Sequence, residues 1–65
     1  MLKLNEKEIT NVNDIPLDKL LINEGYSLQR IAVELNGEIV PKAQYSNTNI
    51  KDGDFLEVVN FVGGG

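Results

Sequence analysis

The sequence FLEVVNFVGGG, at residues 55–65, runs from an apolar segment straight into three glycines. Alternating and apolar residues over 55–62 are typical of a β-strand. Glycine has no Cβ atom and accepts backbone angles that other residues avoid. Fully extended, the four residues from Val62 to Gly65 span at most about 14 Å. We therefore expect an ordered domain over residues 1–61 and a flexible, reactive C-terminal tail over residues 62–65.

The alternation along this strand separates two faces. One face carries Leu56 and Val58 and no charge, so we expect it to point toward the interior. The other face carries Glu57 with three large apolar residues, Phe55, Val59 and Phe61. Exposed aromatic and aliphatic groups in one patch often mark a protein-binding site, which is our interpretation of this face. The alternative is that a loop covers the patch, or that the strand is buried on both faces.

Upstream, residues 31–35 alternate with their apolar side chains on one face and lead into Asn36-Gly37. This dipeptide favours a type I′ hairpin turn, because both central positions need positive φ. The returning strand, residues 38–40, stops at Pro41, which cannot donate to a sheet ladder and so suits an edge. Residues 51–54, Lys-Asp-Gly-Asp, predict a second turn before the last strand.

Near the N-terminus, Leu2 and Leu4 alternate in one strand, and Ile9 and Val12 mark a second strand after a polar turn at residues 5–7. Together these segments predict a hairpin.

A helix follows this hairpin. Asn13-Asp14 provides a capping signal and Pro16 suits the first turn. Gly25 is a natural stop. One stripe at helical spacing holds Leu17, Leu20, Leu21 and Glu24.

The order of elements is thus strand, strand, helix and three strands. It predicts an α+β fold in which a mixed sheet of about five strands packs on one helix. In a β-grasp arrangement the last strand lies centrally, beside the first and parallel to it. The glycine tail would then project from the end of the sheet.

Composition limits the function. The chain has 65 residues, enough for one small domain, and it contains neither cysteine nor histidine. No serine or threonine therefore has a histidine to activate it, so we expect a protein that is not itself an enzyme. The lack of cysteine suggests a reducing cytoplasm. The net charge of −4, with scattered basic residues, disfavours nucleic-acid binding and suits a basic groove on a protein partner.

Other candidate features have simpler explanations. No apolar run approaches the length needed to cross a membrane. Asp52 and Asp54 are expected turn residues and lack the further oxygen ligands of a metal site. Tyr26 and Tyr45 are expected at the rim of the sheet with their hydroxyls in water.

Three segments, residues 31–42, 52–54 and 61–65, resemble the signature of the ThiS family, the small sulfur carriers of thiamin biosynthesis. The resemblance extends over essentially the whole chain. It implies a ubiquitin-like β-grasp fold. Pro16 and the polar loop at residues 46–49 are mild departures from the family pattern.

The resemblance also implies a mechanism. A ubiquitin-activating-type adenylyltransferase would use ATP to adenylate the carboxylate of Gly65. A cysteine desulfurase or another persulfide donor would then supply sulfur, and thiazole synthase would consume the resulting thiocarboxylate. Gly63, Gly64, Gly65 and Val62 would be recognised by the partners, with Phe61 guiding the tail. No cofactor would be bound by the chain itself.

Three other functions stay open at this point. The small subunit of molybdopterin synthase uses the same fold and terminal chemistry, although those chains are usually longer. A ubiquitin-like modifier of protein lysines would also need the Gly-Gly end. A plain binding module would use the exposed sheet face alone. The sequence does not identify the sulfur donor.

Overall fold

The computed structural model describes residues 1–10 and 12–61. A five-stranded sheet and a two-stranded sheet account for the strands of this part, with one α-helix and one 3₁₀-helix. In chain order the elements are β1 (Leu2–Leu4), β2 (Lys7–Ile9), β3 (Ile15–Pro16), α1 (Leu17–Asn23), β4 (Ile31–Leu35), β5 (Glu38–Val40), the 3₁₀-helix η1 (Lys42–Asn47), β6 (Asn49–Ile50) and β7 (Phe55–Asn60).

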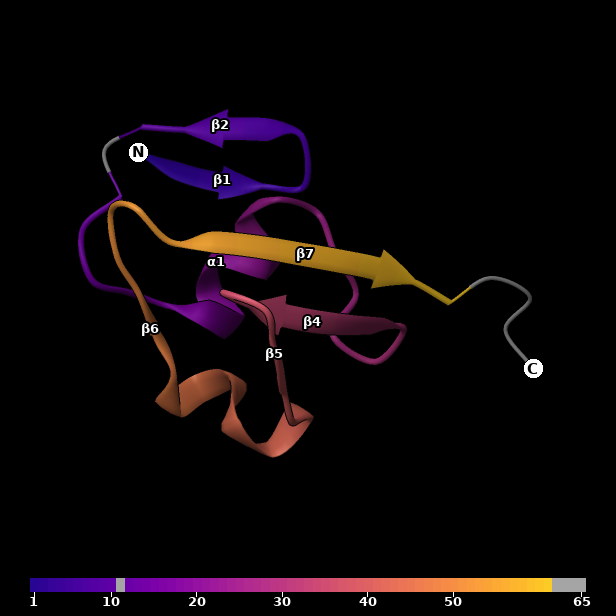
Figure 1. Ribbon diagram of the computed structural model, residues 1–65. Coiled ribbons are helices and arrows are strands. Elements are labelled where there is room, and N and C mark those ends of the chain that lie inside the picture. Colours follow the sequence, from indigo (N-terminus) through magenta and orange to yellow (C-terminus); the bar gives the residue numbers. More distant parts are fainter. Residues whose placement is uncertain (11, 62–65) are drawn as a thin grey trace.

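The main sheet has the strand order β2-β1-β7-β4-β5. Its central strand, β7, runs parallel to β1 and antiparallel to β4, with Leu4 opposite Leu56 and Val33 opposite Val58. Figure 1 shows β7 extended across the molecule, with α1 behind the strands. The predicted α+β, β-grasp arrangement of a mixed sheet on one helix is confirmed.

The core lies between the sheet and α1. Leu56 and Val58, the inward pair predicted for β7, are buried. A fully buried leucine or valine contributes about 1.5–3 kcal/mol relative to an exposed one, so this face stabilises the position of β7. The other buried members are Leu2, Leu4, Leu17, Leu20, Leu21, Ile31, Val33, Tyr45 and Ile50.

The predicted start of the helix is wrong in one respect. Asn13 and Asp14 do not cap α1; Pro16 occupies the N-cap position, and no side chain caps the helix. Instead Ile15 and Pro16 form β3, which pairs with β6, and the Leu17 amide donates to the carbonyl of Thr48 at 2.7 Å. A distant backbone oxygen therefore satisfies an amide that the sequence pattern assigned to a local cap.

Two further predictions need correction. The second strand is residues 7–9, so Val12 lies beyond it, and the turn is Asn5-Glu6 rather than residues 5–7. Tyr45 is buried in the core, not placed at the rim, because residues 42–47 form η1 and pack against α1. The Asn36-Gly37 turn is confirmed, with φ of 52° and 87°. Pro41 follows the edge strand β5 as predicted.

Candidate functional site: the end of β7 and the exposed sheet face

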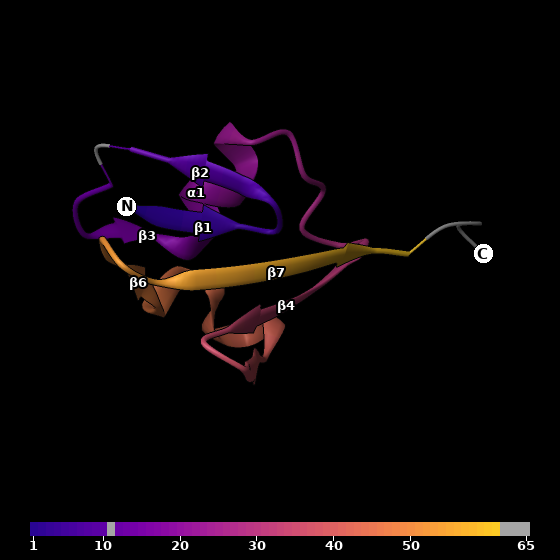
Figure 2. The ribbon, with the colours of Figure 1, turned by 45° about the horizontal axis from the view of Figure 1, so that its top comes forward.

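Strand β7 is paired with β4 up to its last residue and with β1 over its first half. On one side Asn60 lies opposite Ile31, and the Phe61 amide donates to the carbonyl of Arg30 at 2.7 Å. On the other side the backbone amide of Asn5 donates to the carbonyl of Leu56 at 2.8 Å. The hydrogen bond to Arg30 therefore fixes the backbone position of Phe61, the residue immediately before Val62. Figure 2 shows β7 leading away from the body of the molecule at this end.

The side chain of Asn5 extends the contact between β1 and β7 beyond the end of β1. Its Oδ1 accepts a hydrogen bond from the Val58 amide at 2.8 Å, and its Nδ2 donates one to the Val58 carbonyl at 3.2 Å. The side-chain amide thus replaces one peptide group of a neighbouring strand. The backbone φ of Asn5 is +53°, in the left-handed region that asparagine tolerates better than most residues. No sequence pattern indicated this contact, since Asn5 and Val58 are far apart in the chain.

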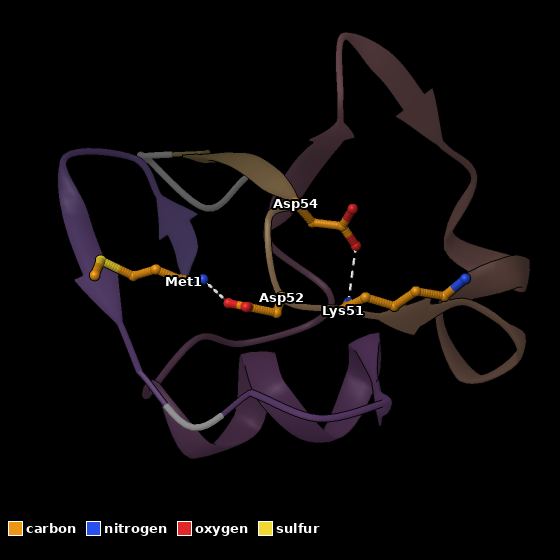
Figure 3. Close-up of polar contacts among 4 residues, drawn as sticks. All are labelled: Met1, Lys51, Asp52 and Asp54. Atoms are coloured by element: carbon orange, nitrogen blue, oxygen red, sulfur yellow. Dashed lines mark hydrogen bonds and ion pairs between the residues drawn. The ribbon is translucent and has the colours of Figure 1, made fainter.

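The beginning of β7 is fixed by the turn at residues 51–54. The Lys51 amide donates to Asp54 Oδ2 at 2.8 Å, and the amino group of Met1 forms an ion pair with Asp52 (Figure 3). Asn36 links this turn to the hairpin: its Nδ2 donates to Asp54 Oδ1 at 3.1 Å, and its Oδ1 accepts the Phe55 amide at 2.9 Å. Asp52 and Asp54 therefore make contacts that stabilise the turn, as predicted. Among the described residues there is no cluster of three or more potential metal ligands.

The predicted apolar patch lies on the face of the sheet opposite α1. Phe55, Val59 and Phe61 have 42%, 59% and 58% of their surfaces exposed. Ile39 of β5, which the sequence analysis did not include, is 75% exposed. Phe55 lies at the start of β7, whereas Val59 and Phe61 lie toward its end, so the exposed apolar residues extend along the strand.

Two ionisable side chains have shifted pKa values. Lys7 Nζ lies 2.9 Å from Glu24 Oε1, and the hydrogen bond and charge of Glu24 raise the pKa of Lys7. Burial raises the pKa of the Tyr45 hydroxyl. Neither residue belongs to the exposed face, so these shifts concern stability rather than the candidate site.

The predicted tail residues, Val62, Gly63, Gly64 and Gly65, lie outside the described residues. Over residues 1–10 and 12–61, no helix is long and apolar enough to cross a membrane.

Comparison with known proteins identifies the family. The model of the ThiS family matches residues 2–65, which include the tail. The chain belongs to the ThiS family.

Individual ThiS relatives agree with this assignment. The chain is 36% identical to the sulfur carrier protein ThiS of Bacillus subtilis over 66 residues, covering 100% of both chains. A crystal structure of the thiamine biosynthesis protein ThiS from Geobacter metallireducens superimposes with a TM-score of 0.76 at 30% identity, covering 98% of this chain and 97% of that one.

A third relative is longer. The chain is 41% identical over 64 residues, 98% of its length, to a protein named thiazole synthase from Paramagnetospirillum magneticum. It spans only 20% of that protein. The longer protein named thiazole synthase thus contains a segment similar to this chain together with additional sequence.

Proposed function

We propose that this chain carries sulfur as a thiocarboxylate on Gly65 and delivers it for formation of the thiazole ring of thiamin. The observation that carries the proposal is the family match over residues 2–65, together with full-length similarity to a named sulfur carrier. The fold supports it, because the central strand ends directly before the residues that would react.

The chemistry requires activation by a partner. A carboxylate at a chain terminus has a pKa of about 3.3–3.7, so it is an anion at neutral pH and a poor electrophile. Attack of a carboxylate oxygen on the α-phosphorus of ATP forms an acyl adenylate and releases pyrophosphate. A persulfide sulfur then attacks the acyl carbon and AMP leaves. A thiol cleaves the resulting acyl disulfide, leaving the thiocarboxylate on Gly65 and a disulfide on the donor.

Each part of the chain has a role in this proposal. The ordered domain holds β7, and the exposed face with Phe55, Val59 and Phe61 docks on the partner enzyme. Val62 and the glycines enter the partner's active site, where the lack of Cβ atoms allows a narrow channel. Glycine at positions 63 and 64 also leaves both faces of the last carbonyl open to attack.

The partners are proposed by reaction class. A ubiquitin-activating-type adenylyltransferase would supply the ATP chemistry, and a cysteine desulfurase or another persulfide donor would supply the sulfur. Thiazole synthase would be the acceptor. The occurrence of similar segments within two proteins named thiazole synthase, from P. magneticum and Magnetococcus marinus, supports this last partner. We place these steps in the cytoplasm, where ATP is available.

Intact-mass spectrometry tests the proposal. The chain is incubated with ATP, the adenylyltransferase from the same genome, a cysteine desulfurase and cysteine. We expect a mass increase that corresponds to replacement of one oxygen by sulfur, with the change located on the C-terminal peptide. A chain whose Gly65 carboxylate is capped as an amide is the matched control and should gain nothing. Conjugates to protein lysines without any sulfur gain would contradict the proposal and favour a protein modifier.

A further inference from the structure

Strand β2 forms one edge of the main sheet, and Figures 1 and 2 show it as the outermost strand beyond β1. The Lys3 amide donates to the carbonyl of Asp54 at 3.0 Å, so the backbone groups of Lys3 are directed toward β7. Glu8 lies directly opposite Lys3. Because opposite residues of an antiparallel pair exchange both hydrogen bonds or neither, the amide and carbonyl of Glu8 point away from β1. No hydrogen bond to either group is found among residues 1–10 and 12–61.

A groove of about 340 Å³ lies beside this edge, between β2 and α1. Its apolar lining consists of Ile9, Val12, Ile15 and Leu20. Leu20 is buried, but the other three are only partly buried against the core. Among the described lining residues only Glu24 carries a charge, and its carboxylate is paired with Lys7. An apolar side chain that fills the groove would therefore bury more apolar surface without stranding a charge, which is favourable.

The edge and the groove together suit an extended peptide. Such a segment gains main-chain hydrogen bonds from an exposed sheet edge, and its alternate side chains enter pockets beside that edge. The residue paired with Glu8 would share the face of Glu8, so a lysine or arginine there would form a favourable cross-strand pair. Its two neighbours would point to the other face, where Ile9 lines the groove. A second copy of the chain fits less well, because symmetric pairing about Glu8 would bring two glutamates together.

We propose that β2 and the groove between β2 and α1 bind an extended, antiparallel segment of a protein partner, with apolar side chains at alternate positions and a basic residue between them. The backbone of the basic residue exchanges hydrogen bonds with the amide and carbonyl of Glu8, and the apolar side chains cover Ile9 and Ile15. The edge has three residues, so it pairs with a short segment rather than with another sheet. The groove lies on the α1 side of the sheet, whereas the exposed apolar residues of β7 lie on the opposite face. The inference therefore does not depend on the proposed function.

Nuclear magnetic resonance titration of the full chain with a synthetic peptide tests the proposal. The probe is Lys-Val-Lys-Val-Lys with both ends capped, which places two valines on one face and a lysine between them. We expect the amide resonances of Glu8, Ile9 and Leu20 to shift as the peptide is added, and hydrogen exchange at the Glu8 amide to slow. Ile39 on β5, the other edge strand, is the internal control, because it does not line the groove. Its resonance should stay in place.

Matched peptides and protein variants separate the main-chain and side-chain contributions. A probe methylated at its central amide nitrogen cannot donate to the Glu8 carbonyl and should bind roughly tenfold more weakly. A probe with serine in place of both valines keeps its charge and should lose at least about tenfold in affinity. In the protein, Glu8→Pro removes the outward amide, which has no partner in the sheet, whereas Glu8→Ala keeps it. The proline variant should therefore bind the probe more weakly than the alanine variant.

Several results would overturn the inference. If millimolar probe leaves the resonances of Glu8 and Leu20 in place, the edge does not bind such a segment. Equal shifts at Ile39 would mean that the peptide pairs with any edge, and equal binding of the serine peptide would leave charge as the only attraction. A methylated probe that binds as tightly as the original would exclude main-chain pairing. Shifts at Glu8 that appear when the chain alone is concentrated would assign the edge to a second copy.

Discussion

At the residue scale, Asn5 supports the central strand through its side-chain amide. Asn5→Gly keeps the positive φ accessible but removes both bonds to Val58, so we expect a loss of about 1–3 kcal/mol in the free energy of unfolding. Asn5→Ala should lose roughly 1 kcal/mol more, because alanine is strained at φ +53°. Urea denaturation measures both losses, and hydrogen exchange at the Val58 amide should quicken in each variant. An Asn5→Gly protein as stable as the original would show that water replaces the side chain at no cost.

Tyr45 illustrates a residue whose place the sequence did not indicate. Truncation to alanine removes a large buried ring, so Tyr45→Ala should cost about 3–5 kcal/mol of unfolding free energy, the range for aromatic residues in cores. Tyr45→Phe keeps the ring and should stay close to the original at neutral pH. Thermal or urea unfolding of the two variants provides the comparison. Similar losses in both would mean that the hydroxyl, rather than packing, fixes the residue.

The same residue predicts a pH dependence. Burial raises the pKa of Tyr45 above its ordinary value of 10.0, so the folded state holds its proton more tightly than the unfolded state does. The associated stability is complete below about pH 10 and is lost as the pH rises toward the folded-state pKa. Tyr45→Phe should therefore lose less stability than the original chain between neutral pH and pH 11, as followed by urea midpoints. Tyr26→Phe is the control, and an equal benefit from it would contradict the assignment to Tyr45.

At the scale of elements, the sequence was most informative where a signal is local. Alternation defined the inward and outward faces of β7, and the Asn36-Gly37 dipeptide fixed the β4–β5 hairpin. The failures involve contacts between distant segments. The β3–β6 pairing consists of two residues on each side, and it displaced the expected helix cap. Short pairings of this kind have no periodicity that a sequence pattern could reveal.

In the candidate site, too, local features could be predicted from the sequence and contacts between distant segments could not. The exposure of Phe55, Val59 and Phe61 could be predicted, because Glu57 marked their face as the one away from the core. The opposition of Glu34 and Glu57 could not, since it depends on the register between β4 and β7. A shift of one residue would have put them on opposite faces. Side-chain chemistry therefore indicated the surface, and strand register defined its charge pattern.

At the scale of the whole molecule, we expect the fold and the proposed chemistry to occupy separate parts of the chain. Within residues 1–10 and 12–61, every buried core residue lies between Leu2 and Val58, so removal of residues 62–65 should leave the urea midpoint unchanged while it abolishes the gain of sulfur. Leu56→Ala is the reciprocal variant: it should lose about 2–5 kcal/mol of unfolding free energy, because it opens a cavity beneath the central strand. Under conditions where it is folded, that variant should still gain sulfur, since the glycine end is intact. Urea unfolding and intact-mass spectrometry on the same samples check both halves of the prediction. A truncated chain that unfolds at clearly lower urea would show that the tail contributes to the fold, and would break the separation between a stabilising body and a reactive end.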